Sequence, residues 1–311
     1  MKIGMVGLGR MGSGMTRRLE DHGHEVATFD PGVASTAKTL RALAQQLEPP
    51  RHVWMMVPAG PITEDTFKKL LGILEPGDTI IDGGNSYFRD SQRRYKQARA
   101  EKISFVDVGV SGGVWGFDVG FCLMAGGDKA QIRRLRPIFD ALAPEDGWAQ
   151  VGPSGAGHFT KMVHNGIEYG LMQAYAEGFE LMYHSEFDLD LSEIAGIWRN
   201  GSVVRSWLLE LLHAAMEQHG DHLDDIAPYV EDSGEGRWTI AEAIAENVPA
   251  PVISAALFAR FASRDEINFA ANDSSCREAN RAYSAALIAG AGTLSLIASK
   301  TVQRPSPESS T

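Results

Sequence analysis

The feature that most constrains the fold of this chain is the order of elements in its first thirty residues. Residues 2–8 form a short apolar run, as in a buried parallel strand. A helical pattern begins near Arg10, and a second strand pattern, 25–29, ends at the carboxylate of Asp30. Where the strand passes into the helix, three glycines follow G-x-G-x-x-G spacing: Gly7, Gly9 and Gly12. This order predicts a βαβ unit that binds a dinucleotide.

Each part of that unit has a physical reason. The first glycine permits a tight turn, the second lets a pyrophosphate approach the backbone, and the third lets the helix pack closely on the strand. The N-terminus of the helix stabilises the phosphate charge. Asp30 is expected to accept hydrogen bonds from the adenosine ribose hydroxyls and to repel a 2′-phosphate. Because "FDPG" supplies no arginine, NAD is favoured over NADP. The candidate cofactor contacts in the turn are Gly7, Leu8, Gly9, Met11 and Gly12.

Strand and helix patterns continue to alternate up to about residue 143, which predicts an α/β Rossmann-type fold with a parallel, doubly wound sheet. The strand-like runs are 52–58, 78–86, 104–113 and 120–128, and the helical ones are 63–74, 89–101 and 128–143. Ligands of such sheets bind beyond the carboxyl ends of the strands. Three loops follow such ends: 57–60 with Val57 and Pro58, 83–86 with Asn85, and 111–113. Their glycines and serines are equally typical of ordinary turns, so both interpretations stay open.

After "VGPSGAG" at 151–157 the strand signals stop and long helical patterns follow. We therefore expect two domains, a Rossmann domain over 1–155 and an all-helical domain over 156–311. The polar, proline-containing stretch 302–311 is typical of a mobile tail. The helical patterns are roughly 157–184, 190–198, 202–218, 238–247, 251–263 and 274–300.

The string "KMVHNGIEYG" carries the strongest chemical signal of the helical half. In a helix its polar residues lie at relative positions 0, 3, 4 and 7, on one face: Lys161, His164, Asn165 and Glu168. Further along, the same face becomes apolar with Met172, Tyr175, Phe179 and Met182. A polar cluster at the end of a buried face is costly unless it is paired or binds a ligand. The alternatives are a surface charge pair and a satisfied buried network; a catalytic cleft is favoured.

Chemistry suggests roles for three of these residues. A lysine that is buried near a cationic nicotinamide loses proton affinity, so Lys161 is a candidate base. Asn165 can hold a substrate hydroxyl or carboxylate without changing the charge. Glu168, two turns from Lys161, is placed to act as an acid on a different carbon. A base and an acid on one rigid helix suit a substrate that is oxidised at one carbon and protonated at another.

The amino-acid composition limits the classes of molecule that this protein is expected to bind. With 29 basic and 40 acidic residues, the formal charge of −11 argues against binding to nucleic acid or to anionic membranes. An anionic substrate must then be held by a local group of positive charges. Cys122 and Cys276 are too few for a metal site or a disulfide framework. The chain opens directly on the first strand and has no apolar run of membrane-spanning length, so a cytoplasmic location is expected.

Several strings between residues 4 and 264 together resemble the β-hydroxyacid dehydrogenases and, within them, the 6-phosphogluconate dehydrogenase family. They are "GLGRMG", "IDGGNS", "GVSGG", "GGD", "KMVHNGIEYG", "GSVVRSW", "GEGRWT" and "ALFARFASR". The most specific is "HNGIEYG", because the wider superfamily has the lysine and an asparagine without this combination of His, Glu and Tyr. "GLGRMG" and "SGG" are shared across the superfamily.

The resemblance implies oxidative decarboxylation of 6-phosphogluconate to ribulose 5-phosphate and CO2. It implies that Lys161 takes the proton of the 3-hydroxyl and later returns a proton to the 3-keto oxygen. Glu168 would protonate C1 of the enediol. Tyr169 and Arg260 match phosphate contacts, and the resemblance also implies that Asn85 lies near the nicotinamide. The positions that match contacts to the sugar acid are Asn85, Ser111, Gly112, Gly113, His164 and Asn165.

Three departures from the long members of this family matter. Ser233, in "SGEGRWT", stands where they have a phosphate-binding lysine; the chain ends near 311 without their second helical repeat; and "FDPG" lacks their cofactor-phosphate arginine. Because of the first two, the family's full set of phosphate ligands is not expected to carry over unchanged, and the third supports NAD. Three arginines are candidates to compensate, although a surface role suits each equally well: Arg205, Arg237 and Arg264.

Two rival functions remain open from the sequence. One is a β-hydroxyacid dehydrogenase that acts on a small 3-hydroxy acid without decarboxylation and has no use for Glu168 as a carbon acid. The other is a non-catalytic NAD-sensing or scaffold protein, against which the complete set of Lys161, Asn165 and Glu168 argues. The apolar stretch 282–298 suggests a subunit interface, by analogy with the family, and hence a homodimer or homotetramer formed through the helical domain.

Overall fold

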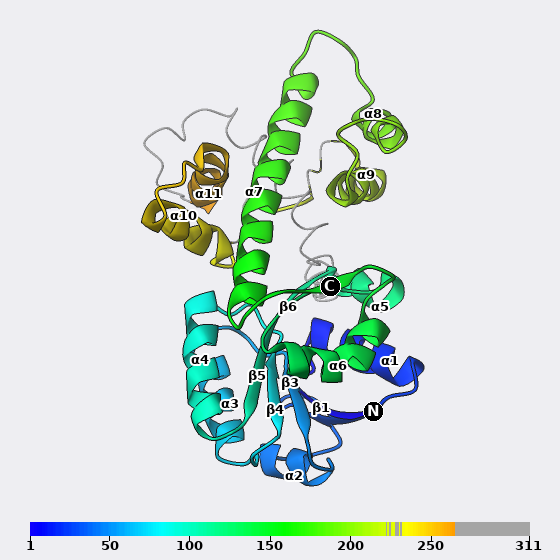
Figure 1. Ribbon diagram of the computed structural model, residues 1–311. Coiled ribbons are helices and arrows are strands. Elements are labelled where there is room, and N and C mark those ends of the chain that lie inside the picture. The colour runs from blue at the N-terminus through cyan, green and yellow to red at the C-terminus, as the bar shows by residue number, and fades with distance from the viewer. Residues whose placement is uncertain (222, 224, 228–229, 231, 265–311) are drawn as a thin grey trace, which may run out of the picture. The chain divides into compact units, whose positions relative to one another are not determined.

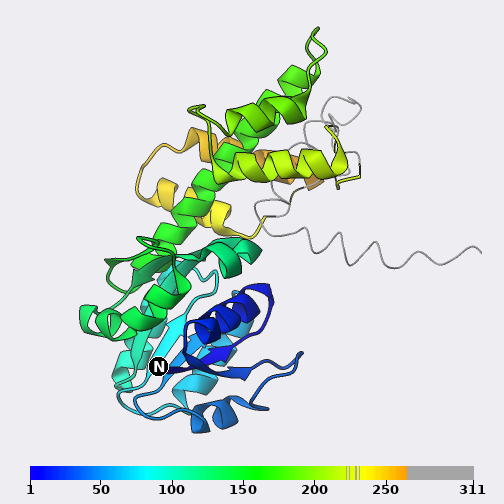
Figure 2. The ribbon, with the colours of Figure 1, turned by 90° about the vertical axis from the view of Figure 1, so that its right-hand side faces the viewer.

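The computed structural model describes residues 1–221, 223, 225–227, 230 and 232–264. The chain divides into two compact units, Met1–Asn165 and Gly166–Thr311. The long helix α7, Ala156–Tyr183, begins in the first unit and continues into the second (Figures 1 and 2). The boundary expected at 155/156 coincides with the start of this helix, whereas the boundary between the two compact units lies ten residues later, after Asn165. The domain boundary therefore stays a prediction.

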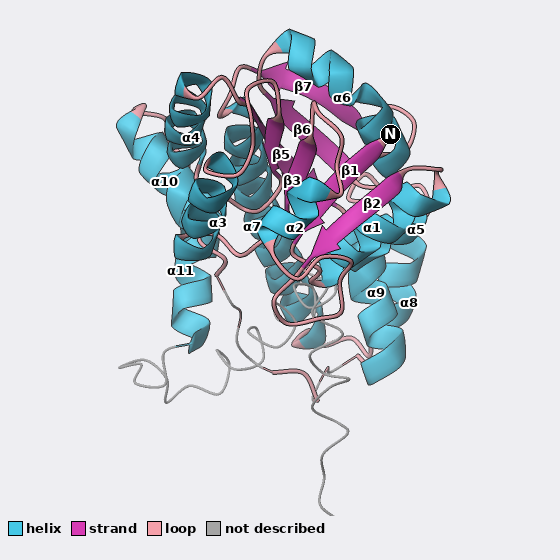
Figure 3. Cartoon of the chain, turned by 90° about the horizontal axis from the view of Figure 1, so that it is seen from below, coloured by secondary structure: helices cyan, strands magenta, loops and turns pink. Residues whose placement is uncertain are grey.

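The first unit contains a seven-stranded sheet in the order β2-β1-β3-β4-β5-β6-β7. Strands β2 and β7 form its two edges (Figure 3). The strands are β1 Lys2–Val6, β2 Glu25–Phe29, β3 His52–Met55, β4 Thr79–Asp82, β5 Ser104–Ser111, β6 Cys122–Gly126 and β7 Trp148–Gly152. The helices between them are α1 Arg10–Asp21, α2 Leu40–Gln45, α3 Pro61–Leu71, α4 Phe88–Ala100, the 3₁₀ turn η1 Gly113–Trp115, α5 Gly116–Val119 and α6 Lys129–Leu142.

Both faces of this sheet are covered, and alternate strand residues supply the two cores. On one face, Ile3 and Met5 of β1 pack with α1 and α6. On the other face, Val6 and residues of β3 and β4 pack with α2, α3 and α4. Helices on both faces of a mostly parallel sheet make a doubly wound Rossmann-type fold, so the predicted fold class is confirmed.

The sheet differs from the prediction in two strands. β6 runs antiparallel to β5, with Asp107 opposite Gly126 and Ser111 opposite Cys122. Only residues 112–121 connect these strands, and that is too short for a crossover back to the starting edge, so the chain reverses direction. The other difference is β7, which the sequence did not predict. Its residues are at most half-buried, as in an edge strand with little apolar signal.

The second unit is helical where it is described, and the helices lie close to the predicted spans. α9 begins at Trp207 and not near 202, because the side chain of Ser206 accepts a hydrogen bond of 3.1 Å from the backbone N–H of Leu209 and so caps the helix there. The predicted helix 274–300, its proposed interface at 282–298, and the tail 302–311 lie outside the described residues. After α7 come α8 Leu191–Trp198, α9 Trp207–His219, α10 Glu235–Ala245 and α11 Pro251–Arg264.

The far end of α7 is buried, as its apolar face predicts. Met172, Tyr175 and Phe179 belong to a core with residues of α8 and α9. Tyr169, nearer the middle of α7, packs instead with Ala256 and Leu257 of α11. Among the described residues, no helix combines the length and the apolar character that crossing a membrane requires.

Candidate active site

The carboxyl ends of the central strands lie in register and define one edge of the sheet. Val6 on β1 is level with Phe29 on β2 and with Met55 on β3, and Met55 is level with Asp82 on β4. The loops that follow these residues therefore emerge together. β5 continues beyond this level to Ser111. The structure thus brings to one edge the loops 7–9, 56–60 and 83–86 and residues 111–113.

The glycine-rich turn has the geometry that a diphosphate needs. Gly7 has φ of +93°, and a Cβ there would lie 2.3 Å from the carbonyl oxygen of Met56. A Cβ on Gly12 would lie 2.0 Å from the carbonyl oxygen of Gly7, so only glycine permits this packing. A Cβ on Gly9 would meet nothing within 4 Å, and no acidic residue stands in the first turn of α1. Open space above backbone N–H groups suits a pyrophosphate. Leu8 and Met11 are half-buried beside these glycines.

Asp30 organises the same turn. Its Oδ2 accepts a hydrogen bond of 2.7 Å from the N–H of Leu8, and its Oδ1 accepts one of 2.7 Å from the N–H of Gly32. The bond from Leu8, followed by that from Gly32, holds the pKa of Asp30 below its usual value despite some burial. An ionised carboxylate has further acceptor capacity on both oxygens. The cofactor role predicted for Asp30 is therefore compatible with its structural contacts.

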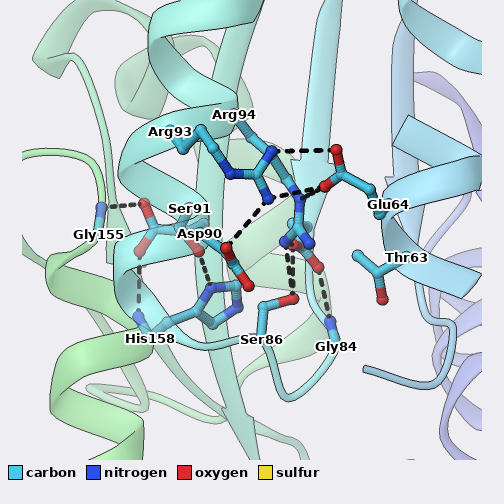
Figure 4. A network of polar contacts seen from close by, with 12 residues as sticks. Thr63, Glu64, Gly84, Ser86, Asp90, Ser91, Arg93, Arg94, Gly155 and His158 are labelled. Atoms are coloured by element: carbon cyan, nitrogen blue, oxygen red, sulfur yellow. Dashed lines mark hydrogen bonds and ion pairs between the residues drawn. The ribbon is translucent and has the colours of Figure 1, made fainter. Parts of the chain in front are cut away.

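A network of charged side chains fixes the base of the loop that carries Asn85, and Figure 4 shows its members Glu64, Arg93 and Arg94 beside Ser86 of this loop. Asp82, with no exposed surface, pairs with Arg94 at 3.1 Å and accepts a hydrogen bond of 2.8 Å from Ser86 Oγ. Glu64 joins the network at 3.3 Å from Arg94. Hydrogen bonds from Arg93 lower the pKa of Glu64 to about 2. Asn85 itself is exposed at the tip of a loop that is thus fixed at its base.

The neighbouring loop after β3 packs against this one. A Cβ on Gly84 would lie 2.7 Å from the carbonyl oxygen of Val57, so the two loops approach closely. The carbonyl oxygen of Pro58 accepts a hydrogen bond of 2.7 Å from Thr63 Oγ1, which ties this loop to α3. Val57 is half-buried and Pro58 is exposed.

Lys161, the candidate base, is buried with 8% of its surface exposed. Its Nζ donates a hydrogen bond of 2.7 Å to Oδ1 of Asn165 and lies 3.4 Å from Nδ1 of His164. Nε2 of His164 lies 3.4 Å from Oγ of Ser111 at the end of β5. The structure therefore brings four of the predicted residues together and does not leave Lys161 in bulk water.

The electrostatics of this cluster favour a neutral imidazole. Burial lowers the pKa of His164, and the nearby charge of Lys161 lowers it further, while the hydrogen bond to Asn165 acts in the opposite direction. A neutral ring keeps one nitrogen as a donor and the other as an acceptor. His164 can thus link Ser111 to the lysine without adding a second positive charge.

Glu168 lies two turns after Lys161 on α7 and is half-buried. Seven residues advance a helix by about 10 Å and almost two full turns, so both side chains share a face. Helical side chains also lean toward the N-terminus, which directs Glu168 toward the turn that carries Asn165. Gly112 and Gly113, both half-buried with positive φ of +129° and +55°, lead from Ser111 into η1.

Tyr169 and Arg260 form a second cluster within the second unit. The guanidinium carbon of Arg260 lies 3.2 Å from the centroid of the Tyr169 ring, and Arg260 is 1% exposed. The hydroxyl of Tyr169 donates a hydrogen bond of 3.1 Å to Oδ1 of Asp232 and accepts one of 3.3 Å from the N–H of Ser233. Two candidate phosphate contacts are therefore adjacent, with a carboxylate that sequence reasoning did not anticipate.

The three arginines proposed to compensate for Ser233 differ in their surroundings. Arg237 forms an ion pair with Asp232 and lies over the ring of Phe261 at 4.5 Å. Burial acts to raise the pKa of Asp232, but the hydrogen bonds from Arg237, Gly234 and Tyr169 outweigh it and lower that pKa. Arg205 and Arg264 are exposed. Arg237 thus lies beside the Tyr169 cluster, and Arg264 reaches it through a hydrogen bond of 3.4 Å from its Nε to the carbonyl oxygen of Arg260.

The fold and this site define a class: a dinucleotide-binding Rossmann unit followed by a helical unit, with a buried lysine and asparagine on the first helix after the sheet. Comparison with known proteins specifies the class further. Residues 2–152 match the family model described as the NAD binding domain of 6-phosphogluconate dehydrogenase, and residues 157–292 match that of the 6-phosphogluconate dehydrogenase C-terminal domain. This chain belongs to the 6-phosphogluconate dehydrogenase family.

Individual relatives agree with that assignment. The chain is 43% identical over 280 residues to an NAD(+)-dependent, decarboxylating 6-phosphogluconate dehydrogenase of Haloferax volcanii, which covers 86% of this chain and 93% of the relative. It is 37% identical to a Bacillus subtilis protein of the same name, over 87% of this chain and 63% of that protein. The solved Plasmodium falciparum 6-phosphogluconate dehydrogenase superposes with a TM-score of 0.77 at 28% identity, covering 97% of this chain and 74% of that one.

Proposed function

We propose that this protein catalyses oxidative decarboxylation of 6-phosphogluconate to ribulose 5-phosphate and CO2 with NAD as the cofactor. The observation that carries the proposal is the buried pair of Lys161 and Asn165 on the face of α7 that continues to Glu168. Such a face supplies a base and an acid to two different carbons of one substrate. The names of the relatives supply the substrate class.

The residues at the strand ends fit the cofactor. The N-terminus of α1 and the open space over Gly9 would receive the diphosphate, and Asp30 would accept hydrogen bonds from the adenosine ribose. Val57, Pro58 and Asn85 would lie near the nicotinamide. When bound, NAD supplies the acceptor for the hydride from C3. The carboxylate of Asp30 supports NAD over NADP because it would repel a 2′-phosphate.

Side chains of α7 carry out the proton transfers of the proposed reaction. Lys161 takes the proton from the 3-hydroxyl, and Asn165 and His164 orient that hydroxyl. Lys161 then returns the proton to the 3-keto oxygen as the carboxylate carbon C1 departs as CO2. Glu168 protonates the neighbouring carbon of the resulting enediol, which is C2 of the substrate and becomes C1 of ribulose 5-phosphate. Ser111, Gly112 and Gly113 hold the sugar acid from the end of β5.

The phosphate is proposed to bind at Tyr169 and Arg260, where Arg260 supplies the positive charge that a net-acidic protein needs locally. We also propose that the enzyme acts in the cytoplasm. It would be a homodimer or homotetramer assembled through a helical domain over 156–311. Analogy with the family supports the assembly.

One assay tests the reaction. The full chain is incubated with 6-phosphogluconate and either NAD or NADP, and reduced nicotinamide and CO2 are both measured. Equal amounts of NADH and CO2 are expected. NADH without CO2 would indicate the rival dehydrogenase of small 3-hydroxy acids, and no turnover with any sugar acid would indicate a non-catalytic protein. Glu168→Gln should slow CO2 release and protonation while NAD binding is retained.

A further inference from the structure

Asp107 is a buried carboxylate to which the proposed chemistry gives no role. It lies on β5 directly in register with Asp82 on β4, and neither residue has exposed surface. Asp82 is paired with the guanidinium of Arg94 at 3.1 Å. The oxygens of Asp107 instead accept hydrogen bonds from the segment in which α7 begins. Figure 4 shows two of these bonds, one to Gly155 and one to His158.

These bonds cap the N-terminus of α7 from a neighbouring strand. Oδ1 of Asp107 accepts hydrogen bonds of 2.6 Å from the N–H of Gly155 and 3.1 Å from Oγ of Ser154. Oδ2 accepts one of 3.0 Å from the N–H of His158, in the first turn of the helix. The first N–H groups of a helix have no partner within it and are usually satisfied by the side chain of the residue before it. That residue is Gly155, which has no side chain, so Asp107 takes over the function.

The capping contact is the first of three between β5 and α7. Every second residue of β5 points to the same face of the sheet, and on this face lie residues 107, 109 and 111. Every third residue of α7 lies on roughly one side of the helix, and this side carries residues 158, 161 and 164. Beyond the Asp107 contact, a Cβ on Gly109 would lie 2.4 Å from Cβ of Lys161, so the lysine sits directly over that glycine. Oγ of Ser111 lies 3.4 Å from Nε2 of His164.

The start of α7 has no room to shift against the sheet. A Cβ on Gly157 would lie 2.5 Å from the carbonyl oxygen of Asp107, and a Cβ on Gly126 would lie 2.8 Å from both carboxylate oxygens. Tight contact on this side and the cap at its first turn together determine the rotation and height of the helix. Lys161 stands three residues, less than one turn, beyond the capped N–H of His158.

We propose that Asp107 is a positioning residue for the reaction: by capping α7 from β5 it sets the location of Lys161 Nζ relative to the substrate hydroxyl. This inference rests on the base role proposed above for Lys161. A base that is displaced by about 1 Å can lose on the order of 10²-fold in rate. Asp107 therefore affects the hydride and proton-transfer step without touching the cofactor or the substrate.

The test is Asp107→Asn, which preserves volume but turns an amide N–H₂ toward one of the N–H donors. The matched control is Asp78→Asn. Asp78 is also buried, at 1% exposed, and accepts hydrogen bonds from the backbone N–H groups of Arg51 and Glu75, at a turn outside the site. For both variants we would measure the melting temperature, NAD affinity, kcat, and the deuterium isotope effect with substrate labelled at C3.

Both variants are expected to melt at a lower temperature and to bind NAD within about two-fold of wild type. Only Asp107→Asn should lower kcat, by about 10- to 100-fold, and raise the isotope effect, because the displaced base makes the hydride step more rate-limiting. The proposal is overturned if kcat and the isotope effect of Asp107→Asn equal those of Asp78→Asn.

A milder variant covers the case in which Asp107→Asn does not fold. Ser154→Ala removes one donor to Oδ1 and leaves the two backbone bonds. It should lower kcat a few-fold with a higher isotope effect; wild-type values for both would reject the positioning role. An inactive wild-type enzyme would instead reject the proposed function, so the two failures are distinguishable.

Discussion

Lys161 and Asn165 are joined by a hydrogen bond of 2.7 Å from Nζ to Oδ1, and each side chain is only 8% exposed. One turn of α7 separates them, which is the spacing at which helical side chains meet. The amide oxygen holds the lysine nitrogen in place without a charge of its own. The candidate base is thus fixed before any substrate arrives, and catalysis benefits from such preorganisation.

Replacing Lys161 with methionine should abolish most of the turnover. Methionine keeps much of the buried volume but removes Nζ, and a positioned base contributes about 10²- to 10⁴-fold to the rate. We expect kcat with 6-phosphogluconate to fall by that range while NAD affinity, followed by fluorescence titration, stays within about two-fold. Lys129→Met, at an exposed position on α6, serves as the control. Appreciable residual turnover in the Lys161 variant would reject the base role.

Gly109→Ala should disturb both stability and activity. The added Cβ would lie 2.4 Å from Cβ of Lys161 and 2.8 Å from the carbonyl oxygen of Gly157, so α7 must move away from β5. Overpacking of this kind costs about 1–3 kcal/mol in the free energy of unfolding. Urea denaturation measures that loss, and steady-state assays should show a lower kcat.

The control for that variant is Gly72→Ala. Gly72 follows α3 with a helical φ of −84°, and its Cβ would make only ordinary contacts at 3.8 Å. Alanine at such a position is expected to be neutral or slightly stabilising. Equal stability and activity of the two alanine variants would contradict the close approach of Lys161 to β5.

The parts of this fold that the sequence predicted are those set by neighbours in the chain. The turn from Gly7 to Gly12, with its strand, helix and terminal Asp30, is specified within thirty residues, and the structure contains all of it. The spacing of Lys161 and Asn165 likewise follows from one helix. Local patterns of this kind are complete in the sequence because each element carries its own hydrogen bonds and its own apolar face.

What the sequence did not predict depends on segments that meet only in the fold. Asp107 caps a helix that begins 49 residues later, and Asp232 accepts a hydrogen bond from Tyr169, 63 residues earlier. A carboxylate inside the apolar run "SFVDVGV" was the available signal for Asp107, since a buried acid needs donors. The reversal at β6 follows from the length of a connection, which the periodicity of the strands does not encode.

Cofactor preference should respond to the residues after β2. Asp30→Ala combined with Pro31→Arg removes the charge that repels a 2′-phosphate and adds one that attracts it. The ratio of kcat/KM for NADP to that for NAD should rise by at least about ten-fold. Pro31→Arg alone keeps the carboxylate and should change the ratio less. An unchanged ratio in the double variant would count against the assignment of NAD.

His164 should make the protein less stable in acid. Burial and then the charge of Lys161 lower the pKa of His164 below its usual 6.5, so the unfolded chain binds a proton that the folded chain does not. The resulting contribution to stability is fully present above pH 6.5 and is lost as the pH falls through 6.5 toward the folded pKa. His164→Gln should therefore lose less stability than wild type between pH 8 and pH 5.

Urea denaturation at several pH values measures this difference. Other histidines are present in both proteins, so their effects cancel in the comparison. At pH 8 the imidazole is neutral in the folded and unfolded chains, and the difference there reports only packing. Parallel stability curves for the two proteins from pH 8 to pH 5 would show that His164 is not the group responsible.

Ser233→Lys should strengthen binding of the phosphorylated substrate. Ser233 is exposed and its Oγ lies 3.1 Å from the hydroxyl of Tyr169, so an ammonium group placed there adds a positive charge beside Arg260 and partly offsets Asp232. A charge pair at about 4 Å contributes roughly 1 kcal/mol in a water-like medium and more where solvent is excluded. KM for 6-phosphogluconate should fall by about 5- to 30-fold, and the gain should shrink at high salt. Unphosphorylated gluconate has no phosphate dianion to attract, so its KM should not fall. Ser233→Met adds length without charge and should leave KM unchanged for both substrates. An equal fall in KM for gluconate would mean that the Tyr169 cluster does not contact the phosphate.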